Sequence, residues 1–245
     1  MSRRAESRVL RAVSGIVLVV CLVTPISGQT VDTGVGVRFS VPQGWELWPE
    51  DFRSLYEEAR KSSGGQYRIL AGFAADSTSE WNSLPHLVLS LDTIPTSWNE
   101  LEASKADLRL PPHMEKKLGD LGVTLEETKA RIDRADSLAW LYAGFERPEG
   151  DLVLTVTAMR PIRGGLLAIT HYGYPEGLSS AEAAVQRLWA SITINPSKQY
   201  DDAIARRQVS DNHPLGPVRQ LIVALLGAGL ILGAVALAMK ARSKR

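Results

Sequence analysis

Apolar and polar side chains alternate in several short stretches of this chain. Between Val35 and Val41 every second residue is apolar, and Pro42 begins the turn that follows, which is typical of a half-buried strand. The same reasoning predicts further strands at 67–75, 86–94, 125–134, 138–146, 152–162 and 166–174. Because turn-length connections such as Arg163-Gly164-Gly165 join the last four, we expect consecutive antiparallel strands there.

Helical spacing of apolar residues occurs in three other stretches. One predicted helix covers 52–59 and ends at the serines and glycines of 62–65. Ser97 and Glu100 have the spacing of a capping box, so a second helix is expected to begin at Ser97. Ser179 and Glu182 repeat this spacing and predict the start of the last helix. The apolar face of that helix comprises Ala184, Val185, Leu188, Trp189 and Ile192.

Helices at both ends of a run of antiparallel strands indicate the α+β class, with an antiparallel sheet covered by helices. Asn195-Pro196 closes this domain, which is predicted to cover 29–195. Residues 196–218 are polar and punctuated by prolines, which is typical of a semi-flexible linker.

The N-terminal end has the order of a secretory signal. Four arginines precede an apolar run at 12–23, and small residues up to Gly28 follow it. The run is shorter than the roughly 20 residues that span a bilayer, so we expect a cleaved signal peptide at 1–28 rather than a second anchor.

The C-terminal end is predicted to be a transmembrane helix at 219–240. Its core, 221–239, contains 19 apolar or small residues without a charge, and such a helix is about 28 Å long. The basic tail at 241–245 favours a cytoplasmic C-terminus and an extracytoplasmic domain in the cell membrane. A sorting signal that is cut and replaced is an alternative, but no Leu-Pro-x-Thr-Gly motif precedes the run.

Charge is distributed unevenly along the chain. Residues 29–216 hold 26 of the 27 acidic side chains and 19 of the 28 basic ones, a net charge of −7. An acidic domain binds nucleic acid poorly, so we expect no nucleic-acid partner. Cys21, the only cysteine, lies in the predicted signal, which excludes disulfides and thiolate chemistry from the domain.

The segment 36–45, which reads GVRFSVPQGW, resembles the first strand and Pro-x-Gly-Trp turn of the PsbP/Mog superfamily. The resemblance extends over the strands at 152–174 and the closing segment 185–192, and covers about 35–195. It implies an α/β/α sandwich around an antiparallel sheet. Members mostly act as binding or assembly subunits, so the resemblance transfers no catalytic residue.

No motif in the sequence predicts a catalytic, cofactor or metal site. The chain lacks a Gly-x-Ser-x-Gly elbow, and its four histidines do not have a metal-ligand spacing. His171 is expected on the strand face of Leu167 and Ile169, as a hydrogen-bonded sheet histidine rather than a ligand.

Two tryptophans and two glycines are the candidate contact residues. Trp45 and Trp48 flank the first turn and are candidates for partner binding, with packing at the core edge as the alternative. Gly229 and Gly233 form a Gly-x-x-x-Gly motif, which predicts a homodimer through the transmembrane helix.

The leading hypothesis is a non-enzymatic, membrane-tethered binding or assembly module with an envelope protein as partner. The alternative is an extracytoplasmic hydrolase whose site is assembled from distant residues. A pocket with convergent His, Asp and Ser groups would favour the hydrolase.

Overall fold

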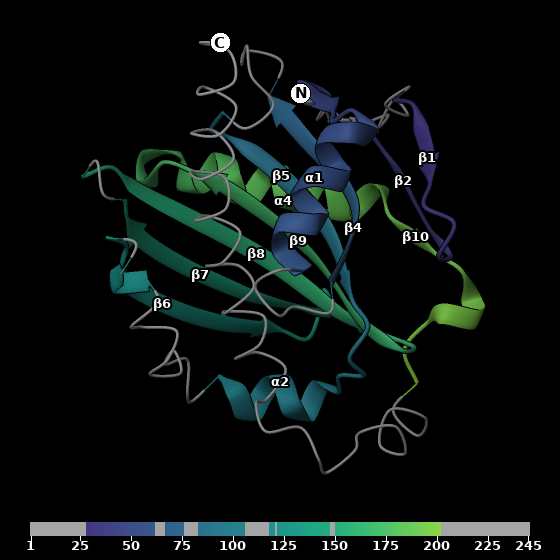
Figure 1. The fold of residues 1–245 in the computed structure, drawn as a ribbon. Coiled ribbons are helices and arrows are strands. Elements are labelled where there is room, and N and C mark those ends of the chain that lie inside the picture. Colours follow the sequence, from purple (N-terminus) through teal and green to yellow (C-terminus); the bar gives the residue numbers. More distant parts are fainter. Residues whose placement is uncertain are drawn as a thin grey trace, which may run out of the picture.

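A seven-stranded antiparallel sheet is the centre of the computed structural model, which describes residues 28–61, 67–75, 83–105, 118–120, 122–147 and 150–201. The strand order is β3-β4-β5-β9-β8-β7-β6 (Figure 1). These strands are β3 (Trp45–Leu47), β4 (Tyr67–Ala75), β5 (His86–Asp92), β6 (Thr124–Asp133), β7 (Leu138–Glu146), β8 (Leu152–Ile162) and β9 (Gly165–Gly173).

A second, three-stranded sheet joins the two ends of the domain. Its central strand is β2 (Val37–Ser40), which pairs on one side with β1 (Thr30–Asp32) and on the other with β10 (Thr193–Ile194). Both pairings are antiparallel, so the last strand of the domain lies beside one of its first.

Helices cover both faces of the large sheet. In Figure 1, α4 (Leu178–Ser191) lies behind the sheet and α1 (Glu50–Lys61) lies in front of it, while α2 (Trp98–Ser104) lies below. Two short 3₁₀ turns, η1 (Pro175–Gly177) and η2 (Pro196–Lys198), flank α4 and β10. The expected α+β class with an antiparallel sheet is therefore confirmed.

The alternation of side chains along each strand places buried apolar residues on both faces of the large sheet. Leu167 and Ile169 of β9 pack with the buried face of α4 and with the three-stranded sheet. An edge-to-face contact between Phe39 of β2 and Phe73 of β4, with ring centroids 5.5 Å apart, joins the two sheets in this core.

The opposite face holds two smaller clusters. Leu166 and Ala168 of β9 pack there with Leu101 of α2, and Trp48 packs with Phe52 and other residues of α1. The helices therefore bury apolar stripes on both sides of the sheet, as a layered α/β/α arrangement requires.

Most of the predicted elements are present, and the differences have local causes. The strands predicted at 67–75, 138–146 and 152–162 agree with β4, β7 and β8. The strands β1, β3 and β10 have only two or three residues each, which is too short for a periodicity signal.

The two capping boxes have different outcomes. At α2 the box is confirmed, because the Ser97 side chain accepts a hydrogen bond from Glu100 N and the Glu100 side chain accepts one from Ser97 N. At α4 the prediction is wrong: the helix begins at Leu178 after the η1 turn, Gly177 is the N-cap residue, and it makes no side-chain cap bond.

Both predicted membrane-related segments lie outside the described residues. These are residues 1–27 of the signal peptide and the span at 219–240 with Gly229 and Gly233. Within the described part of the chain, no helix has the length and apolar character needed to cross a membrane.

Candidate functional site

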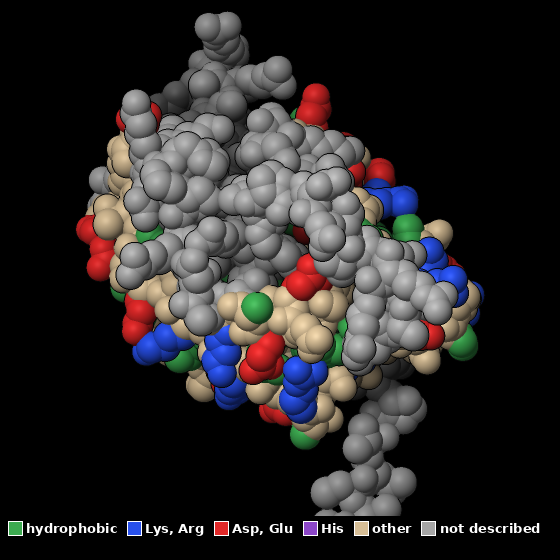
Figure 2. Space-filling model, turned by 90° about the horizontal axis from the view of Figure 1, so that it is seen from below, with side chains coloured by type: hydrophobic (Ala, Val, Ile, Leu, Met, Phe, Trp, Pro, Cys, Tyr) green, Lys and Arg blue, Asp and Glu red, His purple; other side chains and the backbone are tan. Residues whose placement is uncertain are grey.

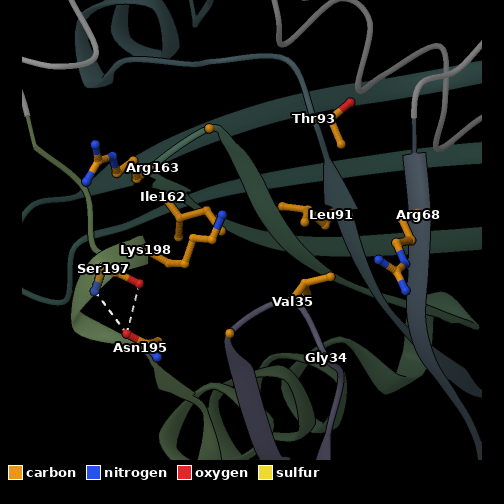
Figure 3. A pocket seen from close by; sticks show the side chains of 12 residues that line it. Gly34, Val35, Arg68, Leu91, Thr93, Ile162, Arg163, Asn195, Ser197 and Lys198 are labelled. Carbon is orange, nitrogen blue, oxygen red and sulfur yellow. Dashed lines mark hydrogen bonds between the residues drawn. The ribbon is translucent and has the colours of Figure 1, made fainter.

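A cleft of about 510 Å³ opens at the end of the domain where the three-stranded sheet meets the large sheet (Figure 3). We call it the end cleft. It is lined by Gly34, Val35, Gly36, Arg68, Leu91, Thr93, Ile162, Arg163, Gly164, Asn195, Ser197 and Lys198. Its volume lies in the range of small-molecule pockets, roughly 300–1,000 Å³.

Four segments that are distant in the sequence build this cleft. They are the β1–β2 turn at 34–36, the paired strands β4 and β5, the β8–β9 turn at 162–164, and the segment 195–198 after β10. Arg68 of β4 lies directly opposite Leu91 of β5 in the strand register. The pairing of β2 with β10 brings the first and last segments together.

Backbone hydrogen bonds fix the positions of the turns around the cleft. Asn195 N donates to Gly36 O at 2.8 Å, and Arg163 N donates to Lys198 O at 2.9 Å. The Asn195 side-chain oxygen accepts from both the backbone N and the hydroxyl of Ser197, each at 3.0 Å (Figure 3). These bonds hold the segment 195–198 against two other turns, so this side of the cleft is preorganised.

Glycine is required where these segments approach one another. Gly36 has φ +84°, and a Cβ there would lie 3.1 Å from Lys198 Cγ. At Gly165, the first residue of β9, a Cβ would lie 2.1 Å from the Asp92 backbone oxygen. A side chain at Gly165 would displace the backbone of β5, whereas at Gly36 the positive φ is the feature that requires glycine.

The rim of the end cleft is cationic and its floor is apolar. Arg68, Arg163 and Lys198 are exposed, and among the described residues none of them forms an ion pair with a carboxylate. Figure 3 shows Arg68 and Lys198 on opposite sides of the cleft, with Lys198 extending toward its middle and Arg163 pointing away. Val35, Leu91 and Ile162 supply the apolar surface between them.

The predicted contact residues Trp45 and Trp48 do not line the end cleft. Trp48 is 3 % exposed and packs edge-to-face on Phe52 with ring centroids 4.8 Å apart. Trp45 is half-buried and contacts the ring of His171 edge-on at 5.9 Å. Both tryptophans therefore pack at the edge of the core, as the alternative interpretation predicted. Partner contact through them stays a prediction.

Two buried histidines lie on opposite faces of the large sheet. His171 is on the α4 side with Leu167 and Ile169, as expected, but within the described residues its Nδ1 has no hydrogen-bond partner. His86 stacks on Tyr172 at 4.7 Å, and its Nδ1 lies 3.3 Å from Ser83 O. Burial, through loss of solvation, lowers the pKa of His86 to about 3 and that of His171 to about 4.

Neither histidine takes part in the end cleft. Its described lining contains Ser197 and Thr93 but no histidine and no carboxylate, so the convergent groups that the hydrolase alternative needs are not assembled there. In the described part of the chain, no three His, Cys, Asp or Glu side chains are grouped as a metal site would require.

Sequence patterns alone did not identify the end cleft. Arg163-Gly164-Gly165 was expected as a hairpin turn, and Gly164 indeed has φ +84° between β8 and β9. A signal for the cleft was present in the sequence, because each of two turn-rich segments contains a basic residue: Arg163 beside Gly164, and Lys198 after Pro196. Nothing in the sequence indicated that these segments meet Arg68.

Comparison with known proteins shows similarities of fold. No family model matches the sequence, and no curated protein does. The solution structure of cyanobacterial PsbP from Synechocystis is similar with TM-score 0.38 and 14 % identity, over 72 % of this chain and 98 % of that one. The crystal structure of LpqN, described as involved in cell envelope biogenesis of Mycobacterium tuberculosis, gives TM-score 0.37 and 17 % identity over 71 % and 88 %.

A third similar structure is a protein from Bacteroides thetaiotaomicron, with TM-score 0.35 and 15 % identity over 71 % of this chain and 51 % of that one. A PsbP structure is thus among those to which the fold of this chain is similar. At these identities the similarities assign no ligand, partner or activity to this chain.

Proposed function

We propose that this chain is a non-enzymatic binding module, held at the outer face of a cytoplasmic membrane by residues 219–240, and that its ligand or partner occupies the end cleft. The observation that carries this proposal is the composition of the cleft. Cations on the rim and apolar side chains on the floor bind and orient a molecule. A preorganised backbone on one side reduces the entropy lost on binding.

The place of the cleft in the chain supports a site close to the membrane. Lys198 is three residues before Asp201, the last residue that the structure describes, and the linker continues to residue 218. As a flexible chain, residues 202–218 would have an end-to-end distance of about 20–25 Å. If 219–240 spans the bilayer, the end cleft lies within that order of distance from its surface.

The topology is tested by adding protease to spheroplasts that express the chain with a C-terminal epitope tag. We expect digestion of the domain to leave a short tagged fragment that contains the membrane span. Disruption of the membrane should then allow the tag itself to be digested. An undigested full-length chain in spheroplasts, with a periplasmic control protein fully cleaved, contradicts the proposed location.

The role of the end cleft is tested by site-specific crosslinking in cells. The domain has no cysteine of its own, so Ser197→Cys introduces one reactive group on the cleft rim. Ser179→Cys is the matched control, because it replaces an exposed serine in the first turn of α4, which does not line the cleft. A photoactivated crosslinker attached to the Ser197→Cys variant should give a discrete adduct that the Ser179→Cys variant does not give. Equal adducts, or no adduct from either variant, contradict binding in the cleft.

A further inference from the structure

The end cleft combines features that select an amphiphilic anion. Arg68 and Lys198 face it from opposite sides, and the apolar side chains of Val35, Leu91 and Ile162 lie between them (Figure 3). An inorganic anion would fill only part of a volume of about 510 Å³ and would leave the apolar surface exposed to water. A ligand with a charged head and an apolar group uses both surfaces.

The arrangement of the cations favours a tetrahedral head group. An arginine side chain donates two parallel hydrogen bonds to two oxygens of a phosphate or carboxylate, whereas a lysine acts as a compact charge. Arg68 and Lys198 lie on opposite sides of the cleft. A phosphate group directs its oxygens to several sides of one phosphorus atom, so it can accept from a paired arginine donor on one side and from a lysine on the other. A carboxylate whose two oxygens both pair with the arginine has no third oxygen for the lysine.

The net charge of the domain is negative, so the cations of the end cleft are a local exception on its surface. Residues 29–216 carry a net charge of −7, so the domain as a whole repels anions. On the face in Figure 2, the described acidic and basic side chains are interspersed, and hydrophobic side chains appear only in small separate areas. Attraction of an anion must therefore come from local groups, and the end cleft provides the cations Arg68 and Lys198.

We propose that the end cleft binds a phosphate ester that carries an apolar group, with the phosphate between Arg68 and Lys198 and the apolar group on Val35 and Leu91. This inference rests on the proposed function and names the class of its ligand. Two sources have this chemistry, namely a phospholipid head group at the membrane surface and a soluble organic phosphate.

The test uses the full chain in a phosphate-free maltoside detergent, with binding measured by calorimetry. The probes are inorganic phosphate, hexyl phosphate and dihexanoylphosphatidylglycerol. Tighter binding of the phosphatidylglycerol than of hexyl phosphate assigns the site to a lipid head group, and the reverse order assigns it to a soluble ligand. Either order supports the inference, whereas inorganic phosphate binding as tightly as both esters overturns it.

Variants decide whether the cleft is the site. Charge-assisted hydrogen bonds contribute about 1.5–3 kcal/mol each, so Arg68→Gln and Lys198→Gln should each weaken ester binding about 10-fold to 100-fold. Arg187→Gln is the matched control, because Arg187 is an exposed cation of α4 outside the cleft. An equal loss with Arg187→Gln indicates nonspecific attraction and refutes the inference.

Val35→Thr tests the apolar floor with a side chain of nearly the same shape. We expect weaker binding of both esters and unchanged binding of inorganic phosphate. Unchanged ester binding contradicts the assigned position of the apolar group. An unfolding midpoint within about 2 °C of wild type, a shift that corresponds to about 0.5–1 kcal/mol, shows that each variant is folded.

The crosslinking experiment separates this inference from the proposed function. If the Ser197→Cys variant gives a specific adduct while Arg68→Gln and Lys198→Gln leave ester binding unchanged, the cleft is a binding site for a ligand of another class. If neither experiment gives a specific result, the proposed function fails with the inference.

Discussion

Gly72 of β4 leaves the space in which the Trp48 ring lies. A Cβ at this position would be 1.9 Å from Trp48 Cε3, and Trp48 N also donates to Gly72 O at 2.8 Å. The ring is held there against Phe52 and Tyr56 of α1, with centroid distances of 4.8 and 5.1 Å. The missing side chain at Gly72 therefore allows the Trp48 ring to pack inward.

Gly72→Ala is expected to lower the free energy of unfolding by about 2 kcal/mol or more, because overpacking a filled core forces side chains and backbone to shift. Gly119→Ala is the control, since a Cβ at Gly119 meets no atom within 4 Å. Urea unfolding of both variants measures the difference. A stability loss below about 0.5 kcal/mol for Gly72→Ala, the range of ordinary surface substitutions, would falsify this account of the Trp48 position.

The two buried histidines make stability depend on pH. Their pKa values are about 3 and 4 in the folded chain, below the ordinary value near 6.5. The unfolded chain therefore binds more protons than the folded chain below pH 6.5, and stability is lost as the pH falls. From pH 7.5 to 5 the loss is about 2 kcal/mol for each histidine, or about 4 kcal/mol together.

Chemical unfolding at several pH values between about 5 and 7.5 measures this dependence. His171→Gln should remove about half of it, because the glutamine side chain does not titrate in that range. A wild-type stability that stays constant over this interval, or a variant with the full wild-type dependence, contradicts the assignment to these residues.

At the scale of elements, α2 and α4 begin differently although both have a serine followed three residues later by a glutamate. Ser97 is the N-cap residue of α2, whereas Ser179 is the second residue of α4 and lies inside the helix. The η1 turn, which starts at Pro175, leads directly into Leu178 and sets the helix start one residue before Ser179. A motif spacing of this kind therefore predicts a helix but does not fix its first residue.

Ser97→Ala should lower the free energy of unfolding by about 1 kcal/mol, because it leaves the Glu100 N–H without its acceptor. Ser179→Ala should change it by less than about 0.5 kcal/mol, since an exposed serine within a helix makes no cap. Denaturant unfolding compares the two, and equal effects would show that the α2 box is not a cap in solution.

At the scale of the molecule, the return of β10 to β2 closes the domain and forms the end cleft. Thr193 pairs with Arg38 and Ile194 pairs with Val37, so the exit of the chain lies beside its entry. Lys198, which lines the cleft, is 21 residues before residue 219, where the proposed anchor begins. The proposed binding site and the proposed anchor are thereby connected by a short stretch of chain.

At the same scale, the Gly229 and Gly233 motif predicts that two copies of the chain associate. Gly229→Ile and Gly233→Ile should reduce association of the full chain in lipid vesicles, because close approach of two helices requires small residues at the contact. Ala224→Ile is the matched control, since in the predicted helix position 224 would be on the opposite side from both glycines. Energy transfer between labelled chains measures association, and an equal decrease with the control contradicts a specific contact at the glycines.

The sequence alone determined the local features of this protein. Alternation within each strand and helical spacing within each helix depend on neighbours a few positions apart, so β4, β7, β8 and the buried face of α4 were predictable. Charge and hydropathy at the two ends likewise predicted an export signal and an anchor from short stretches of sequence.

Only the tertiary structure decided which distant segments meet. The end cleft joins Gly36, Arg68, Arg163 and Lys198, which are positioned by strand pairing and by hydrogen bonds between turns. The inward position of Trp48 depends in the same way on Gly72 of another strand. Local patterns specify which side of an element is apolar, but the contacts that build a site depend on the register between elements, and that is fixed only when the whole core packs.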